Sequence, residues 1–304
     1  MADKTVRKGS LQFWPRKRAR KILPSVNWIP IRKQAEKDEK KGLLGFIGYK
    51  VGMVSLNVKD NTPNSSTKGK VISMPGTILE CPPLKIYSVR LYKDDKVRDI
   101  VVGFDDKLKS KLKKPKSFKK IEGDFDYLNI IVYPDVKGKA VYLSELGISG
   151  SKEEQLQFVN NKIGKQILAS EVLSGLVDVR GVTKGKGLQG PVRRFGISLK
   201  DHKSEKGRRR PGSLAPWHPA RVTFRAPQAG QTGFQTRIAY NKFIMKTGSG
   251  DFENGFHHYG KITSEYVIVK GSIPGTKKRA LLLTSPIMPS KKQIKQNYDI
   301  INII

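Results

Sequence analysis

The chain has 304 residues, 37% of them hydrophobic, which is enough for the core of one large or two ordinary domains. Its 59 Lys and Arg residues against 26 Asp and Glu residues give a formal net charge of +33, and self-repulsion of that size favours a polyanionic partner. A single cysteine, Cys81, excludes an intrachain disulfide framework, and no apolar run approaches the roughly 20 residues that span a membrane.

Residues 1–42 are predicted to form a basic N-terminal extension. Arg16, Lys17, Arg18, Arg20 and Lys21 lie between extended pieces at Trp14-Pro15 and at Trp28 to Pro30, because proline fixes its own φ and disfavours helix in the residue before it. A solvated tail and a nuclear-localisation signal are the alternatives. An arm along RNA is favoured by apolar side chains that a free tail would leave in water: Phe13, Trp14, Ile22, Leu23, Val26 and Trp28.

Short apolar runs with glycine and proline punctuation predict one discontinuous β domain, with a first part at 43–91 and a second part at 176–290. Its expected strands lie in 43–53, 70–80, 84–92, 176–182, 221–226, 235–247, 265–271 and 279–284. The C-terminal tail, 291–304, ends in an apolar run that we expect to pair with the protein's own sheet or with a partner.

An inserted α+β subdomain is predicted over residues 92–175. The run 105–116 predicts a short basic helix closed by Pro115, and 128–133 a buried strand. Ser151 to Glu154 has the form of a capping box, after which Leu156, Val159 and Ile163 fall on one helix face.

Residues 184–235 form a central basic loop. Between Lys184 and Arg225 stand twelve Lys and Arg residues against only Asp201 and Glu205, and glycines and prolines interrupt any regular period. Ordering such a loop costs about 1 to 2 kcal/mol per residue in backbone entropy. We therefore expect it to be disordered in the free protein and ordered against RNA.

Gly185, Gly187 and Gly190 have the spacing of a dinucleotide fingerprint, but Pro191 and a run without helical period follow. These glycines instead predict backbone approach to phosphate. His202, His218, His257 and His258 show no metal-binding spacing, and no catalytic constellation stands out, so we expect no cofactor, no metal and no enzymatic activity. Sequence alone leaves open whether Trp217 is a core residue at the root of the loop or a stacking platform at its tip.

Five runs in this order, RKGSLQFWPRKRA, GVTKGKGLQGPVRRFGI, PWHPARV, AGQTGFQTR and GFHHYG, resemble the family of universal large-subunit ribosomal protein three in its archaeal and eukaryotic form. The resemblance implies a Greek-key β-barrel of the translation-protein type with long basic extensions. It also implies a structural protein of the large subunit in the cytoplasm that binds the 3′ domain of rRNA early in assembly and lies beside other ribosomal proteins. In this family the central loop approaches the peptidyl transferase centre, with a tryptophan at its tip that Trp217 matches.

The candidate rRNA-binding residues combine the charge argument with this resemblance: Trp14, Arg16, Lys17, Arg18, Arg20, Lys184, Lys186, Gly187, Arg193, Arg194, Arg208, Arg209, Arg210, Trp217, His218, Arg221, Gln231, Arg237, Asn241 and Lys246. Two other classes stay open. An architectural duplex-DNA-binding protein would share the charge, and an RNA-modifying enzyme would need a cofactor cleft that no motif indicates.

Overall fold

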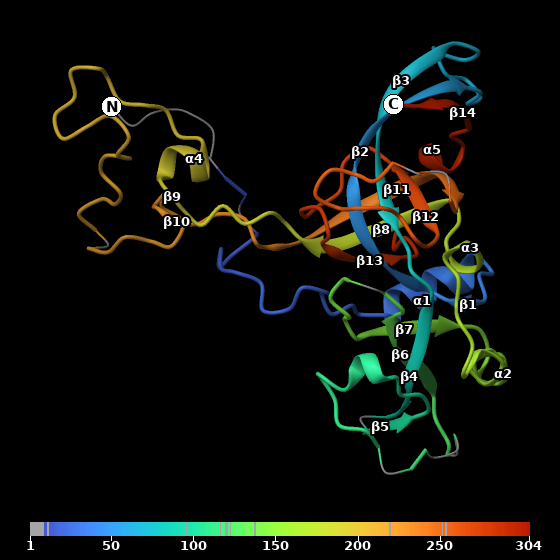
Figure 1. Cartoon of the computed structure of the whole chain (residues 1–304). Helices are drawn as coiled ribbons and strands as arrows, with labels where there is room; N and C mark the ends of the chain where they lie inside the picture. The colour runs from blue at the N-terminus through green and yellow to red at the C-terminus, as the bar shows by residue number, and fades with distance from the viewer. Residues whose placement is uncertain are drawn as a thin grey trace. The chain divides into compact units, whose positions relative to one another are not determined.

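A computed structural model describes residues 9–10, 12–94, 96–115, 117–118, 121, 123–136, 138–218, 220–250, 252 and 254–304. The protein is mainly β, and it divides into two compact units (Figure 1). The loop module comprises residues 1–20 and 182–236, and the body comprises 21–181 and 237–304.

The larger sheet of the body has seven strands in the order β13-β8-β11-β12-β3-β2-β14. Because β13 pairs with both β8 and β2, six of these strands pair in a ring; Leu282 of β13 lies opposite Arg180 and opposite Ile47. The strand bounds are β2 Gly45–Asp60, β3 Val71–Glu80, β8 Leu176–Val182, β11 Thr236–Gly248, β12 Tyr266–Lys270, β13 Ala280–Thr284 and β14 Tyr298–Ile303.

The second sheet of the body has five strands in the order β1-β7-β6-β4-β5. Its bounds are β1 Gly42–Leu43, β4 Leu84–Lys93, β5 Lys96–Val101, β6 Tyr127–Pro134 and β7 Ser144–Ser149. The strand β4, which we assigned to the first part of the β domain, pairs with β5 and β6 in this sheet instead. The cause is the Cys81-Pro82-Pro83 break, after which the chain leaves the larger sheet rather than returning to it.

Helix α1, Ile29–Lys37, was not expected from the sequence. Pro30 lies in its first turn, where the missing N–H of proline costs nothing, so it starts the helix instead of preventing it. Ile31 and Ala35 are buried, and Arg32 donates from Nε to the Ile148 carbonyl and from Nη2 to the Leu128 carbonyl, both at 2.8 Å. The helix is therefore part of the body, and the prediction of an extended piece at Trp28 to Pro30 is wrong.

Trp28, at the start of α1, is 4% exposed and packs in the protein core. A Cβ built on Gly147 would lie 2.9 Å from its ring, so only glycine fits beside it. Leu23 is also buried in the core. Both side chains, which we took as support for an arm along RNA, are instead packed in the protein.

The second helix, α2 at Lys152–Lys162, confirms the predicted capping box: Glu154 N donates to Ser151 Oγ at 3.3 Å, and Ser151 N donates to Glu154 Oε2 at 2.9 Å. Val159 is fully buried, with Leu156 and Ile163 packed against the core. The basic helix predicted over 105–116 is wrong, because within the described part, 105–115, the 3₁₀ turn η1 at Asp106–Leu108 is the one helical element. Successive lysines give that segment one buried anchor, Leu108, which is too little to hold a longer helix.

Most expected strands are present, and four of them follow the sequence closely: β6 in the middle of the chain, and β12, β13 and β14 near its end. β6 has the predicted buried centre, and β12 and β13 lie where 265–271 and 279–284 were expected. β14 pairs with β2, so of the two alternatives for the tail, the protein's own sheet or a partner, the first is observed. Residues 221–226 form bends and a turn rather than the expected strand, and their Val222 and Phe224 side chains are exposed. The remaining short elements are α3 Ala169–Val172, α4 Pro191–Phe195, α5 Lys291–Ile294, β9 Leu188–Gln189 and β10 Gly230–Gln231.

Candidate nucleic-acid interface

The central segment of the loop module closes through a two-stranded ribbon. β9 pairs with β10, and two hydrogen bonds continue the pairing beyond Leu188 and Gln231, from Lys186 N to the Thr232 carbonyl and from Thr232 N to the Gly187 carbonyl, both at 2.9 Å. Gly233 has φ +70° and lies so close to Lys184 that a Cβ would be 2.0 Å from the Lys184 carbonyl oxygen. The ribbon therefore depends on a glycine at that position.

Cationic side chains dominate the surface of residues 184–225. Ten of the twelve Lys and Arg side chains are exposed, and with Asp201 and Glu205 the segment carries a net charge of +10. Among the described residues of 182–236, the one acid–base contact joins His202 Nδ1 to Asp201 Oδ1 at 3.1 Å. Internal pairing thus leaves this charge unneutralised, and it is available to an external polyanion.

Arg194 is an exception to this outward orientation. Its Nε donates to the Gln231 carbonyl at 3.1 Å, its Nη1 donates to the Gln228 carbonyl at 3.0 Å, and burial lowers the pKa of its guanidinium. Gln231, another candidate, donates from Nε2 to the Thr232 and Gly233 carbonyls at 3.2 Å. Both side chains hold the base of the loop, and their expected contacts with RNA remain predictions.

Trp217 is 86% exposed, the largest exposed fraction among the large hydrophobic side chains described. Its ring lies 6.4 Å from that of His218, edge to face, and His218 is also exposed. An exposed indole of this kind offers a face for a nucleotide base. Of the two positions that the sequence left open for Trp217, the exposed one is observed.

The described N-terminal residues 12–20 pack against the central segment within the loop module. The Arg16 guanidinium lies 4.5 Å from the Phe195 ring and donates to the Ser10 carbonyl at 2.9 Å, and Trp14 meets Phe224 edge to face at 5.2 Å. Ala19 N donates to the Phe234 carbonyl at 2.8 Å. We call these contacts the arm clasp. They make one cationic module of the two extensions that we had treated as separate, with Lys17, Arg18 and Arg20 exposed.

The other exposed candidates of the loop module are Lys184, Lys186, Gly187, Arg193, Arg208, Arg209, Arg210 and Arg221. Three further candidates lie on β11 in the body. Asn241, with φ +51°, donates from its backbone N to Asp178 Oδ1 at 2.8 Å and from Nδ2 to the Met288 carbonyl at 2.9 Å. It is a structural connector, Arg237 is half-buried, and Lys246 is exposed.

A short helix, α4, begins directly after Gly190, where the sequence led us to expect no helix. It has five residues, and the two-residue β9 before it pairs antiparallel with β10, so the βαβ unit of a dinucleotide site is absent from this described segment. The aromatic partners Phe195 and Phe224 were not expected from the sequence. An aromatic residue close to an arginine run was the available signal, because guanidinium groups stack on such rings.

The fold and this surface define a class: a mainly β protein that carries a cationic module with an exposed tryptophan. The sequence matches the family model for ribosomal protein L3 over residues 1–119 and 132–301. It is 37% identical to large ribosomal subunit protein uL3 of Archaeoglobus fulgidus, over 98% of this chain and 95% of that protein. Identity to the uL3 of Methanothermobacter thermautotrophicus is 38%, over 94% of this chain and 93% of that protein.

The chain therefore belongs to the ribosomal protein L3 family, which confirms the resemblance inferred from its motifs. The described residues contain no helix long and apolar enough to cross a membrane.

Proposed function

We propose that this protein is a structural constituent of the large ribosomal subunit and binds large-subunit rRNA through its loop module. One observation carries the proposal: residues 184–225 expose ten cations and neutralise almost none of them internally. RNA phosphates supply the missing counter-charge, and the release of their counterions favours binding. The archaeal relatives are named as proteins of the large ribosomal subunit.

Different side chains make different kinds of contact with RNA, according to their chemistry. Exposed lysines and arginines meet phosphate oxygens, and Gly187, with φ +64° and no atom within 4 Å of a built Cβ, lets the backbone approach RNA closely. Trp217 and His218 stack on bases or riboses. Arg194, Gln231 and the arm clasp hold the module in the shape that presents these groups.

The body supports this module as a Greek-key β-barrel of the translation-protein type. The support for closure is the double pairing of β13, with β8 on one side and β2 on the other. The proposed domains are an RNA-binding arm at 1–20, barrel parts at 43–80 and 176–290, an insert at 84–175 that includes β4, and the tail 291–304, which adds β14 to the larger sheet. Lys246 and Arg237 extend the RNA contact onto β11.

The family resemblance also supports a proposal for where the protein acts and at which stage of ribosome assembly it binds. The protein acts in the cytoplasmic ribosome without catalytic activity. It joins the 3′ domain of the rRNA early in assembly beside neighbouring ribosomal proteins, and its Trp217 approaches the peptidyl transferase region.

Sedimentation of the tagged protein with ribosomal subunits in rising salt tests this function. A constituent held by many phosphate contacts stays with the large subunit, whereas a loosely attached factor dissociates as its few ionic contacts weaken. Filter binding of the purified protein should favour large-subunit rRNA over duplex DNA of equal length. Equal affinity for the two nucleic acids would support the architectural DNA-binding class instead.

A further inference from the structure

The body contains a cavity of about 560 Å³, lined by residues from loops that are far apart in sequence. Tyr259 to Ser264, between β11 and β12, forms one wall and includes the end of the GFHHYG motif that the loop module does not use. The segment around Asp135 and Lys139, after β6, forms another wall, and Lys278 comes from the turn before β13.

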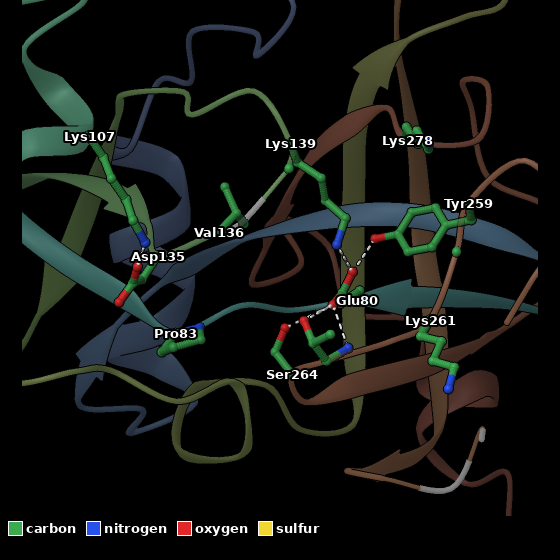
Figure 2. Close-up of a pocket in the computed structure, with 13 residues that line it drawn as sticks. Glu80, Pro83, Lys107, Asp135, Val136, Lys139, Tyr259, Lys261, Ser264 and Lys278 are labelled. Atoms are coloured by element: carbon green, nitrogen blue, oxygen red, sulfur yellow. Dashed lines mark hydrogen bonds and ion pairs between the residues drawn. The ribbon is translucent and has the colours of Figure 1, made fainter. Parts of the chain in front are cut away.

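A buried carboxylate, Glu80 at the end of β3, forms the floor of this cavity. Figure 2 shows Lys139, Tyr259 and Ser264 converging on it. Glu80 Oε1 also accepts from Thr263 N and from Ser264 Oγ, both at 3.0 Å. Burial alone would raise the pKa of Glu80, but the hydrogen bonds from Lys139, Tyr259 and Thr263 reverse this effect and lower it. Glu80 is thus ionised and saturated with donors, and does not act as an acceptor for a ligand.

The rim of the cavity is cationic. Lys107 and Lys139 are paired with Asp135 and Glu80, so their charges cancel within the wall. Lys261 and Lys278 are both exposed, and neither ammonium has an acidic partner among the described residues. The lining therefore has a surplus of two positive charges. In Figure 2 the Lys261 ammonium points away from Glu80, and an exposed lysine changes rotamer within nanoseconds, so it can turn toward a bound anion.

We propose that this cavity binds a backbone phosphate of rRNA, held by Lys261 and Lys278, so that the body has an RNA contact of its own. This inference rests on the proposed function, since it names a second contact for the same partner. The cations of the lining are all lysines, which meet phosphate as point charges and do not impose the planar fork with which arginine binds a carboxylate. Pro83 and Val136 are its main apolar residues, too few to seat an acidic peptide by side-chain burial.

The first test is the double variant Lys261→Ala/Lys278→Ala in the full-length protein. Its matched control is Lys33→Ala/Lys165→Ala, which removes two exposed lysines from other parts of the body. Affinity for full-length large-subunit rRNA of Archaeoglobus fulgidus is measured by filter binding at several salt concentrations. The cavity variant should reduce the magnitude of the negative slope of log affinity against log salt by about 0.7 to 0.9, the change expected for the loss of one phosphate contact. The control should leave that slope unchanged, and equal slopes for both variants would overturn the proposal.

The second test locates the contact directly. Lysine acetylation of the free and RNA-bound protein, followed by mass spectrometry, should show Lys261 and Lys278 protected by RNA while Lys33 and Lys165 react in both states. Protection that appears only when other ribosomal proteins are added would reject RNA as the occupant and indicate an acidic protein surface. Failure of the unmodified protein to bind rRNA at all would refute the proposed function, whereas normal binding with a reactive Lys261 and Lys278 would refute this inference alone.

Discussion

The body and the loop module are built by different physical means. Every residue of β8 and β13 is buried, and the body's core is a continuous cluster of aliphatic and aromatic side chains. Among the described residues of the loop module, only Val182 and Phe195 are buried. The body is thus stabilised by apolar burial, while the module relies on a short ribbon, a few side-chain-to-carbonyl bonds and aromatic contacts. The difference implies that RNA completes the module and that the body folds without it.

Replacing Arg208, Arg209 and Arg210 should have the largest effect, and it should change RNA binding by the loop module without changing the stability of the body. For the variant Arg208→Ala/Arg209→Ala/Arg210→Ala, the negative slope of log rRNA affinity against log salt should decrease in magnitude by about 2 to 3, because three phosphate contacts are removed. Arg208 Nε donates to the Lys200 carbonyl at 3.1 Å, but all three side chains are exposed and outside the body's core. Thermal unfolding of the body should therefore be unchanged. A variant with wild-type salt dependence, or one that unfolds at a lower temperature, would contradict this division.

In the body, by contrast, replacing Glu80 should change stability. Glu80→Ala leaves the Lys139 ammonium, which is 12% exposed, without its buried partner, and should reduce the free energy of unfolding by about 3 kcal/mol. The exposed Glu153 provides a control, since Glu153→Ala should change that free energy by about 0.5 kcal/mol or less. Urea denaturation followed by tryptophan fluorescence measures both. A loss no larger than the control's would show that Glu80 does not hold these loops.

Because of the Glu80 carboxylate, the stability of the body should depend on pH. The pKa of Glu80 in the folded protein is below its ordinary value of 4.5, so folding is favoured by its ionised form. The stability it contributes is complete above pH 4.5 and is lost as the pH falls through the lower, folded pKa. Comparison of Glu80→Gln with the unmodified protein should show a stability difference that is constant from pH 7 to about pH 5.5 and shrinks in stronger acid. If this stability difference instead grew as the pH fell, the pKa of Glu80 would be raised by folding rather than lowered, and the prediction would be wrong.

Trp217 gives a smaller effect that is confined to binding. With 86% of its surface exposed, Trp217→Ala should leave stability unchanged and weaken rRNA binding by about 1 to 3 kcal/mol, the contribution of one stacked base. Trp217→Phe keeps an aromatic face and should retain part of that affinity. If the alanine variant binds as tightly as the unmodified protein, the exposed indole is not a stacking platform.

Much of the body, and the positive charge of the loop module's surface, could be predicted from the sequence, because both depend on residues that are close together in the chain. The buried runs of β6, β12 and β13, and the capping box at Ser151, each depend on neighbouring residues. Helix α1 was missed because Pro30 was taken as a breaker, although in the first turn it is a helix starter.

The candidate site was predictable in its charge but not in the direction of each side chain. Arg194 resembles its neighbour Arg193 in sequence, yet it donates to the carbonyl of Gln231, 37 residues away, while Arg193 is exposed. Asn241 likewise connects Asp178 to Met288. Such contacts depend on which distant carbonyl lies within reach, and no local period or composition encodes that distance. The arm clasp was missed for the same reason.

The arm clasp gives the smallest effect and tests whether the module has a fold of its own. Arg16→Ala removes a guanidinium that lies 4.5 Å from the Phe195 ring and 5.2 Å from the Trp14 ring, an interaction of about 0.5 to 1 kcal/mol at an exposed site. Limited trypsin digestion of the free protein should then cleave residues 184–225 several-fold faster than in the unmodified protein, whereas Lys17→Ala, which removes an exposed cation of the same arm, should not. Bound rRNA should slow cleavage in all three proteins, because phosphate contacts order the loop at the cost of its backbone entropy. Should free protein resist trypsin throughout 184–225 even with Arg16 replaced, the module would be stable without RNA, and the contrast between it and the body would be one of charge only.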